Sequence, residues 1–322
     1  MAIWAFHFPT KEILHPDPSE AAELRKKGWC LWYDLKPNEF DNELLLQVGL
    51  DQEDEDEDPY VWVRIEQNFA RFRLTECQVR DEGIKTVKIH VYFFEDVCIS
   101  VSPEESKIIR SARKHAEKDF KEVAQSIGFL LFELFENALN GYGRTLQILA
   151  KTNRDIQEDL FDITDKKGNF KRTSQLLRDL LKLRHHLSMM MEVLRRLTNR
   201  KLSYLSEGSQ GGLNHLNGRI VLLQNEVLSE RDALASALNL YLGMNAHQTN
   251  QIIQQLTNIS FYFLPLSFVA AVYGMNLEIP EYEFTQNYMN YKFFWLGVAG
   301  IVSFVYFYQR VLLRKQQQDL MN

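Results

Sequence analysis

The sequence predicts a cytosolic α/β domain followed by long stalk helices and two C-terminal transmembrane helices. Three observations support this fold class. Residues 1–102 contain short segments rich in β-branched and aromatic residues, which favour strands. No proline occurs between Pro103 and about Gly243, and apolar residues recur there at helical spacing. Two long apolar runs follow, although the mean hydropathy of the whole chain is only −0.29.

The α/β domain is predicted over residues 1–102. Val87-Lys88-Ile89-His90-Val91 alternates with a period of two residues, as a half-buried strand does. The candidate strands are Ala2–Phe8, Trp29–Asp34, Tyr60–Ile65, Phe69–Leu74, Thr86–Phe94 and Val97–Val101, and Asp41–Leu50 is a candidate helix. In the acidic loop 51–58 every residue except Gln52 is Asp or Glu. Because like charges repel, this run favours a solvated loop over a weak cation-binding site.

The stalk is predicted over residues 103–255. Its apolar spacing indicates three long helices: Glu104–Phe161 in one or two pieces, Thr173–Glu207, and Leu213 onward. Breaks are expected at Gly168-Asn169 and at Gly208–Gly212. Helices of this length with few breakers are typical of coiled-coil-like stalks and hairpins.

Residues 256–275 and 291–313 are predicted to cross a membrane. The first run continues the third stalk helix and is almost free of charge, and about twenty apolar residues cross ~30 Å of hydrocarbon. The second run carries aromatic residues near both ends, as interfacial belts do: Tyr291, Trp295, Tyr306 and Tyr308.

Charge sets the predicted orientation. The end of the second span is basic and therefore cytosolic by the positive-inside rule, with Arg310, Arg314 and Lys315 leading into the tail 314–322. The link 276–290 has no Lys or Arg and is predicted to be a periplasmic loop; its acidic residues are Glu278, Glu281 and Glu283. The N-terminal residues lack a signal-peptide pattern, which predicts a multi-pass inner-membrane protein with both termini in the cytosol.

Composition excludes several other classes. The net charge of −6, without a basic stripe, argues against a nucleic-acid partner. Cys30, Cys77 and Cys98 are far apart and form no CxxC motif, which indicates reduced thiols in the cytosol. No catalytic Ser/His/Asp set, zinc-spaced cluster or P-loop stands out, so neither enzyme activity nor a cofactor is expected. His185-His186 indicates exposed stalk histidines, and Gly141-Tyr142-Gly143 indicates helical residues rather than an ion filter.

One face of the first span has the character of a pore lining. Small polar and narrow apolar residues recur on it at steps of three and four, and with Asn250 below them they are Leu256, Ser260, Leu264, Ser267 and Ala271. Polar groups cost less against a wet lumen than against lipid, and a ring at Leu264 could gate by dewetting. A contact between helices built from small residues is the alternative. Pro265 predicts a kink, because it lacks the N–H of a helix hydrogen bond.

Four residues at the end of this span, Tyr273-Gly274-Met275-Asn276, resemble the signature of the CorA-type magnesium channel family. The resemblance extends upstream through Thr249-Asn250, Leu256-Thr257 and Leu264–Val272, and downstream into Glu278-Ile279-Pro280-Glu281. The strong match covers Thr249–Glu281, and the predicted architecture of the whole chain agrees with the family.

The resemblance implies a funnel-shaped homopentamer in the lipid bilayer that passes divalent cations, magnesium above all and also cobalt or nickel. Tyr273, Gly274, Met275 and Asn276 would form the selectivity entrance. The Asn276 carboxamide would contact the hydrated ion, because Mg²⁺ gives up its water reluctantly. The acidic loop residues Glu278, Glu281 and Glu283 would concentrate cations outside. The family's cytosolic regulatory metal sites match no definite residues here.

Two other functions compete with this one. A related zinc-transporting branch shares the architecture but varies the middle residue of the signature, and Met275 favours the magnesium branch. Such a transporter could be coupled to protons. A membrane-tethered scaffold is the third hypothesis, although it has no use for the polar stripe or for Asn276. Ala271 departs from the family pattern, since some relatives have glycine there, and this substitution should narrow that point of the helix.

Overall fold

The computed structural model describes residues 2–40, 63–66, 69–80, 83–103, 106–124, 126–160, 166–200, 202 and 205–273, together with 296, 297, 299, 300, 303, 306 and 307. The chain divides into two compact units, Met1–Asn239 and Leu240–Asn322. The predicted helix Asp41–Leu50 and the acidic loop 51–58 lie outside the described residues.

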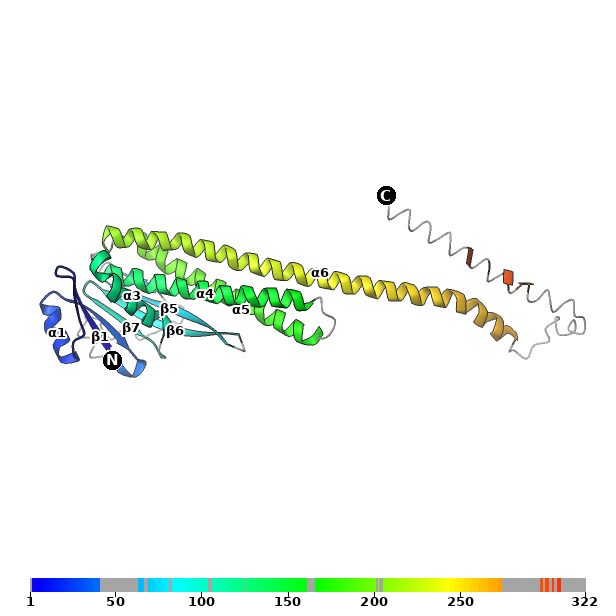
Figure 1. Cartoon of the computed structure of the whole chain (residues 1–322), viewed down its shortest axis with the longest axis horizontal. Helices are drawn as coiled ribbons and strands as arrows, with labels where there is room; N and C mark the ends of the chain where they lie inside the picture. The colour runs from blue at the N-terminus through cyan, green and yellow to red at the C-terminus, as the bar shows by residue number, and fades with distance from the viewer. Residues whose placement is uncertain are drawn as a thin grey trace, which may run out of the picture. The chain divides into compact units, whose positions relative to one another are not determined.

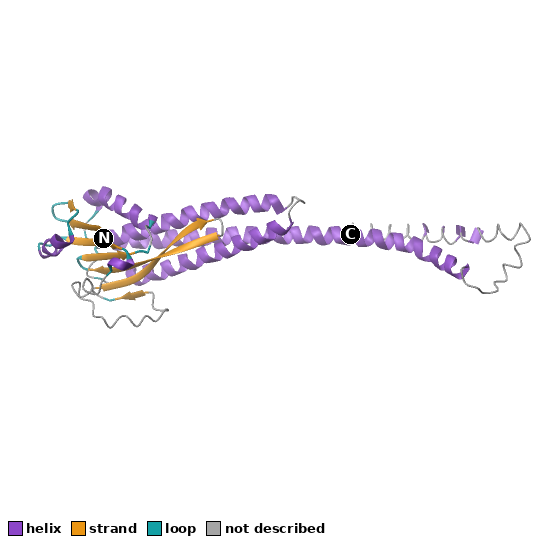
Figure 2. Ribbon diagram, turned by 90° about the horizontal axis from the view of Figure 1, so that it is seen from below, coloured by secondary structure: helices purple, strands orange, loops and turns teal. Residues whose placement is uncertain are grey.

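The first unit is built on a seven-stranded sheet with the order β2-β1-β3-β7-β6-β5-β4 (Figures 1 and 2). Only the β3–β7 pair is parallel among these strands. The strands are β1 (Ala2–His7), β2 (Glu12–Leu14), β3 (Cys30–Leu35), β4 (Val63–Ile65), β5 (Phe69–Arg80), β6 (Gly83–Phe94) and β7 (Val97–Val101). All six predicted strands have a counterpart, and β2 was not predicted.

The β5–β6 hairpin is longer than predicted, because β5 continues through polar residues to Arg80. Its register runs without interruption from Phe69 opposite Phe94 to Arg80 opposite Gly83. The hairpin end is fixed to a helix: the backbone N–H of Ile84 donates to the buried Asp179 carboxylate at 3.1 Å. Gly83 has a φ of +111°, which side chains rarely adopt, and a Cβ there would overlap the side-chain ends of Gln175 and Asp179, so the position favours glycine.

The described helices of both units are α1 (Pro18–Lys26), the short 3-10 helix η1 (Pro37–Glu39), α3 (Lys107–Val123), α4 (Gly128–Leu160), α5 (Lys166–Thr198) and α6 (Glu207–Tyr273). In the first unit, α4 packs between α3 and α5 and against β5, while α5 also contacts β4, β5 and β6 (Figures 1 and 2). The predicted α/β domain with long helices is thus confirmed. The predicted region Glu104–Phe161 forms two pieces.

The two predicted glycine breaks are wrong. Gly168 and Asn169 lie within α5, and Gly208–Gly212 lie within the first turns of α6. Instead, α5 ends at Thr198 and α6 begins at Glu207. Packing explains the second case, since a Cβ at Gly212 would lie 2.9 Å from the Phe132 ring. Glycine lets α6 approach α4 closely there and does not end the helix.

Aromatic side chains form much of the core of the first unit. Phe120 of α3 lies 5.1 Å from Phe6 of β1, and Phe135 of α4 stacks on Phe72 of β5 at 5.2 Å between ring centroids. All four side chains are fully buried. Such pairs add about 0.5–1.5 kcal/mol each beyond their burial, so they anchor both helices on the sheet.

The N-terminus of α3 is capped by a serine that a buried carboxylate holds. Ser106 Oγ accepts hydrogen bonds from the backbone N–H groups of Ile108 and Ile109 at 3.2 and 3.3 Å. The same hydroxyl donates to Glu76 Oε2 at 2.6 Å. Glu76 is only 4% exposed, and its negative charge lies at the positive end of the helix dipole. The contact ties α3 to β5.

We expect Ser106→Ala to lower the free energy of unfolding of the first unit by about 1–2 kcal/mol, because it removes a cap and a donor to a buried carboxylate. Thermal unfolding of the full chain in detergent, followed by tryptophan fluorescence, measures the change. Ser188→Ala is the control, since the exposed Ser188 hydroxyl only donates to a carbonyl of its own helix, at 3.0 Å, and accepts from Gln224. Equal effects of the two substitutions would contradict the role of Ser106.

Candidate functional site

The predicted pore-lining residues all lie on one continuous helix. α6 extends to Tyr273 and contains Pro265 in its interior. At about 100° per residue, steps of three and four keep side chains on one side of a helix, so the stripe is compatible with the backbone. Its residues are Asn250, Leu256, Ser260, Leu264, Ser267 and Ala271. Because Pro265 has no N–H, the carbonyl of Phe261 loses its usual helical donor.

In the isolated chain, α6 exposes large apolar side chains on the stripe and away from it. Leu256 and Leu264 of the stripe are 62% and 68% exposed. Residues off the stripe have side chains that are similarly exposed to solvent, including Ile259, Phe263 and Phe268. A monomeric soluble protein rarely leaves an apolar surface of this extent in water. This segment therefore has the surface of a helix that is covered by other chains or by lipid.

Hydroxyl groups along the same helix bind their own backbone. Thr249 Oγ1 donates to the Asn245 carbonyl at 2.9 Å, and Thr257 Oγ1 donates to the Ile253 carbonyl at 2.8 Å. This bond to the residue four positions earlier allows a small polar side chain to lie on an apolar helix.

The predicted selectivity entrance is not part of the described structure. Tyr273 is the last residue of α6, and Gly274, Met275 and Asn276 lie outside the described residues, as do Glu278, Glu281 and Glu283. Of the predicted second span, only scattered positions between 296 and 307 are described. Within the part of the chain that the structure describes, no helix combines the length and the hydropathy that a membrane span requires. The signature remains a prediction.

A buried carboxyl group in the first unit was missed by sequence reasoning. Glu133 of α4 is 4% exposed, and Asn137 Nδ2 donates to its Oε2 at 3.2 Å. Burial, with smaller contributions from the charges of Glu136 and Asp119, raises the pKa of Glu133 to about 7, and the Asn137 bond opposes this shift. The signal in the sequence was a lone acid within the apolar run Phe129–Phe135.

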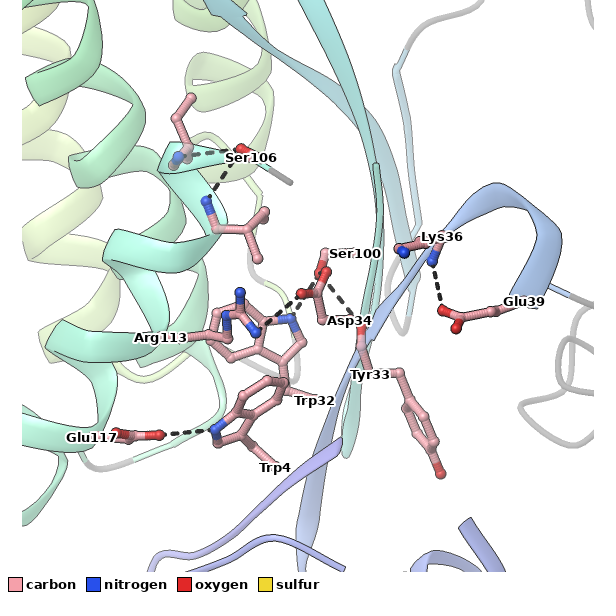
Figure 3. A network of polar contacts seen from close by, with 12 residues as sticks. Trp4, Trp32, Tyr33, Asp34, Lys36, Glu39, Ser100, Ser106, Arg113 and Glu117 are labelled. Carbon is pink, nitrogen blue, oxygen red and sulfur yellow. Dashed lines mark hydrogen bonds and ion pairs between the residues drawn. The ribbon is translucent and has the colours of Figure 1, made fainter. Parts of the chain in front are cut away.

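A polar network joins the sheet to α3 (Figure 3). Arg113 lies over the Trp4 ring at 4.9 Å and forms a 3.4 Å ion pair with Asp34. Ser100 Oγ donates to Asp34 at 3.2 Å and accepts from Trp32 Nε1 at 3.1 Å. Burial raises the pKa of Asp34, and Arg113 opposes the shift. These groups satisfy one another, which indicates a structural role.

Other predicted features have structural explanations. Tyr142 of the Gly-Tyr-Gly run donates from its hydroxyl to the Thr75 carbonyl at 2.6 Å, so this run packs α4 on β5. His185 is exposed, but His186 is partly buried, and burial lowers its pKa to about 4. Among the described residues no group of His, Cys, Asp or Glu could hold a metal ion.

The three cysteines are free, as predicted from their spacing. Cys77 and Cys98 are buried, while Cys30 is partly buried. Burial raises the pKa of Cys30 and of Cys77 to about 12, and that of Cys98 further. All three therefore stay protonated at neutral pH.

Known proteins share both the sequence pattern and this fold. The chain is 27% identical over 180 residues to the cobalt/magnesium transport protein CorA of Thermotoga maritima. The aligned region covers 56% of this chain and 51% of that relative, so the chain spans about half the length of this relative. The fold is also similar to the complete structure of the CorA magnesium transporter from Methanocaldococcus jannaschii. The superposition covers 96% of this chain and 97% of that chain, with a TM-score of 0.78 and 18% identity. The superposition on the ZntB cytoplasmic domain from Vibrio parahaemolyticus covers 78% of this chain and 98% of that domain, with a TM-score of 0.57 and 14% identity.

The family comparison covers nearly the whole chain. Residues 28–313 match the model of the CorA-like Mg2+ transporter protein family, a range that includes most of the sheet, the long helices and the signature. The chain therefore belongs to the CorA-like Mg2+ transporter protein family.

Proposed function

We propose that the chain is one subunit of a homopentameric channel that passes divalent cations, magnesium foremost, into the cytosol. The observation that carries this proposal is the exposed apolar part of α6 with its polar stripe, in a chain of a transporter family. Residues 256–275 and 291–313 span the inner membrane in this proposal, and both termini are cytosolic. Residues 1–102 and 103–255 are the cytosolic domain and the stalk.

The proposed pathway is neutral throughout. Asn276 from each subunit forms the outer ring, where carboxamides hydrogen-bond the hydration shell of Mg²⁺ without stripping it. Gly274 lets the backbone turn there, and Leu264 forms a narrow apolar ring inside. A neutral path does not trap a dication as a ring of carboxylates would. The membrane potential supplies about 4.6 kcal/mol per dication at ~100 mV, from about 2.3 kcal/mol per charge.

Zinc transport on the same scaffold is the second candidate function. The residue that bears on it is Met275, because the zinc-transporting branch of the resemblance varies this position. Such a zinc transporter could work with or without coupling to protons. Cobalt and nickel are further candidate ions for the channel.

Ion flux into proteoliposomes tests the proposal. We expect the purified full chain to admit Mg²⁺ when the membrane potential is negative inside, with or without a pH gradient. Zn²⁺ uptake that requires a proton gradient would replace the channel by the zinc transporter. A chain that assembles normally and admits neither ion would favour a membrane-tethered scaffold.

A further inference from the structure

A pocket lies between α4 and α6, which run side by side in the first unit (Figure 1). Its volume is about 440 Å³, within the usual range of small-molecule sites, about 300–1,000 Å³. Its apolar wall is formed by Leu139, Leu222 and Leu223, and its polar wall includes Arg144 and Arg219. The pocket is separate from the proposed pore lining, which begins at Asn250.

One of the two guanidinium groups is held in place by α4. Arg219 donates from Nη1 to Glu136 Oε1 at 3.2 Å and from Nη2 to Asn140 Oδ1 at 2.8 Å. A guanidinium has five N–H donors, so donors of Arg219 remain for a further acceptor. Because the side chain is already oriented, a ligand that it binds does not have to immobilise it, which lowers the entropic cost of binding.

The second guanidinium, that of Arg144, has no acidic partner among the described residues. It is exposed, and no residue of the described structure forms an ion pair or a hydrogen bond with it. Its own helix offers no partner, because residues 140–148 contain no Asp or Glu. Since Glu136 balances Arg219, the pocket keeps the positive charge of Arg144. Such a guanidinium recognises a carboxylate through two parallel N–H bonds.

Gly143 keeps the space beside Arg144 open. It belongs to the run Gly141-Tyr142-Gly143, and glycine inside a helix is less favourable than alanine. Its backbone does not require glycine, since its φ is not positive. Crowding does not require it either, because a Cβ there would lie 4.0 Å from Leu223 Cδ2, which is an ordinary contact. What the missing side chain provides is room in the pocket.

We propose that this pocket binds a small organic anion that consists of one carboxylate group and an apolar body. The carboxylate accepts hydrogen bonds from Arg144 and Arg219 and balances the positive charge of the pocket. The apolar body covers the leucine wall, of which Leu222 is exposed in the isolated chain. The ligand thereby bridges α4 and α6. This inference does not depend on ion transport, since only binding is claimed.

Isothermal titration calorimetry of the full chain in detergent, with 1-naphthoate as the probe, tests this inference. We expect saturable binding with a Kd of about 1 mM or lower, after subtraction of titrations into detergent without protein. The probe 1-naphthamide has the same shape without the charge, and acetate has the charge without the apolar body. Each should bind at least about tenfold more weakly than 1-naphthoate, because each lacks one half of the recognition.

Variants of the pocket separate its charge from its space. Arg144→Gln should weaken 1-naphthoate binding at least about tenfold, because the charged donor is lost. Gly143→Met should weaken it as strongly by filling the pocket, whereas Gly143→Ala adds only a Cβ and should bind within about twofold of wild type. The control Arg154→Gln, at an exposed arginine of α4 that does not line the pocket, should bind as wild type does.

Three results would overturn this inference and leave the proposed channel untouched: no saturable binding of 1-naphthoate, equal binding of 1-naphthamide, or wild-type affinity in Arg144→Gln. A wild-type oligomer that binds no probe, together with an Arg144→Gln variant that dissociates on size-exclusion chromatography, would instead assign the pocket to an acidic side chain of a neighbouring subunit. Thermal unfolding of the Gly143 variants shows whether they fold as wild type does. If Gly143→Met does not, the comparison of Arg144→Gln with Arg154→Gln decides.

Discussion

Replacing Asn276 by alanine is expected to reduce Mg²⁺ flux into proteoliposomes by at least about a hundredfold, because the outer ring then offers the hydrated ion no hydrogen-bonding oxygen. The ring acts on the hydration shell, so the loss should be larger for the strongly hydrated Mg²⁺ than for larger cations. Asn276→Asp should also slow the flux, but because the ion is then bound too tightly and not because it is bound too weakly. A ring of carboxylates binds a dication too firmly to release it, and conduction requires binding that is weak enough for exit.

Two controls make this result specific. Asn287→Ala changes the same type of residue in the predicted loop 276–290 but outside the signature, and it should conduct as wild type does. Comparable amounts of oligomer on size-exclusion chromatography exclude an assembly defect. Unchanged Mg²⁺ flux in Asn276→Ala would remove the signature from the pore and would count heavily against the proposed channel.

The second large effect concerns stability and pH. Burial raises the pKa of Glu133 to about 7 from its ordinary value of 4.5, so the folded protein binds this proton more tightly than the unfolded chain does. The stabilisation is therefore fully present below about pH 4.5 and is lost as the pH rises through 7. A shift of this size corresponds to about 3 kcal/mol, at about 1.4 kcal/mol per pKa unit.

We expect Glu133→Gln to stabilise the first unit at about pH 8 by roughly 2–3 kcal/mol and to have little effect near pH 4.5, because glutamine imitates the protonated acid. Thermal unfolding of the full chain at both pH values, followed by tryptophan fluorescence, measures the difference. Glu122→Gln at an exposed position of α3 is the matched control and should be neutral at both values. A Glu133→Gln variant whose advantage does not grow with pH would show that Glu133 titrates as an ordinary exposed acid.

The sequence predicted the sheet and the helices well where one pattern dominated. β6 and β7 follow from alternation and β-branched residues, and α4 follows from apolar residues at helical spacing. The sequence-based predictions were wrong where tertiary contacts determine the bounds of a helix or a strand. Glycines that look like breakers lie inside α6, because Phe132 occupies the space of a Cβ at Gly212. The extension of β5 to Arg80 depends on pairing with β6 and on the Asp179 contact of the hairpin end, neither of which is a local property.

In the candidate site, too, the sequence predicts the features that depend on local spacing and not those that depend on contacts between elements or subunits. Spacing predicted that Asn250 to Ala271 lie on one helix, because helical periodicity is local and α6 is continuous, while their role in a pore stays a prediction. Spacing could not predict the titration of Glu133, since its pKa depends on burial and on Asp119 of another helix. The proposed ring at Asn276 needs several copies of the chain, so neither one sequence nor one subunit contains its geometry.

The buried thiols of the first unit make this protein suitable for site-directed labelling. With pKa values of about 12, Cys30 and Cys77 present the reactive thiolate in only about one molecule in 10⁵ at pH 7, and Cys98 presents still less. A single cysteine introduced along α6, for example at Leu264, would react only where water reaches it, and there at a rate far above this background. Maleimide or methanethiosulfonate reagents could therefore report water access along α6 residue by residue, with the native cysteines left in place.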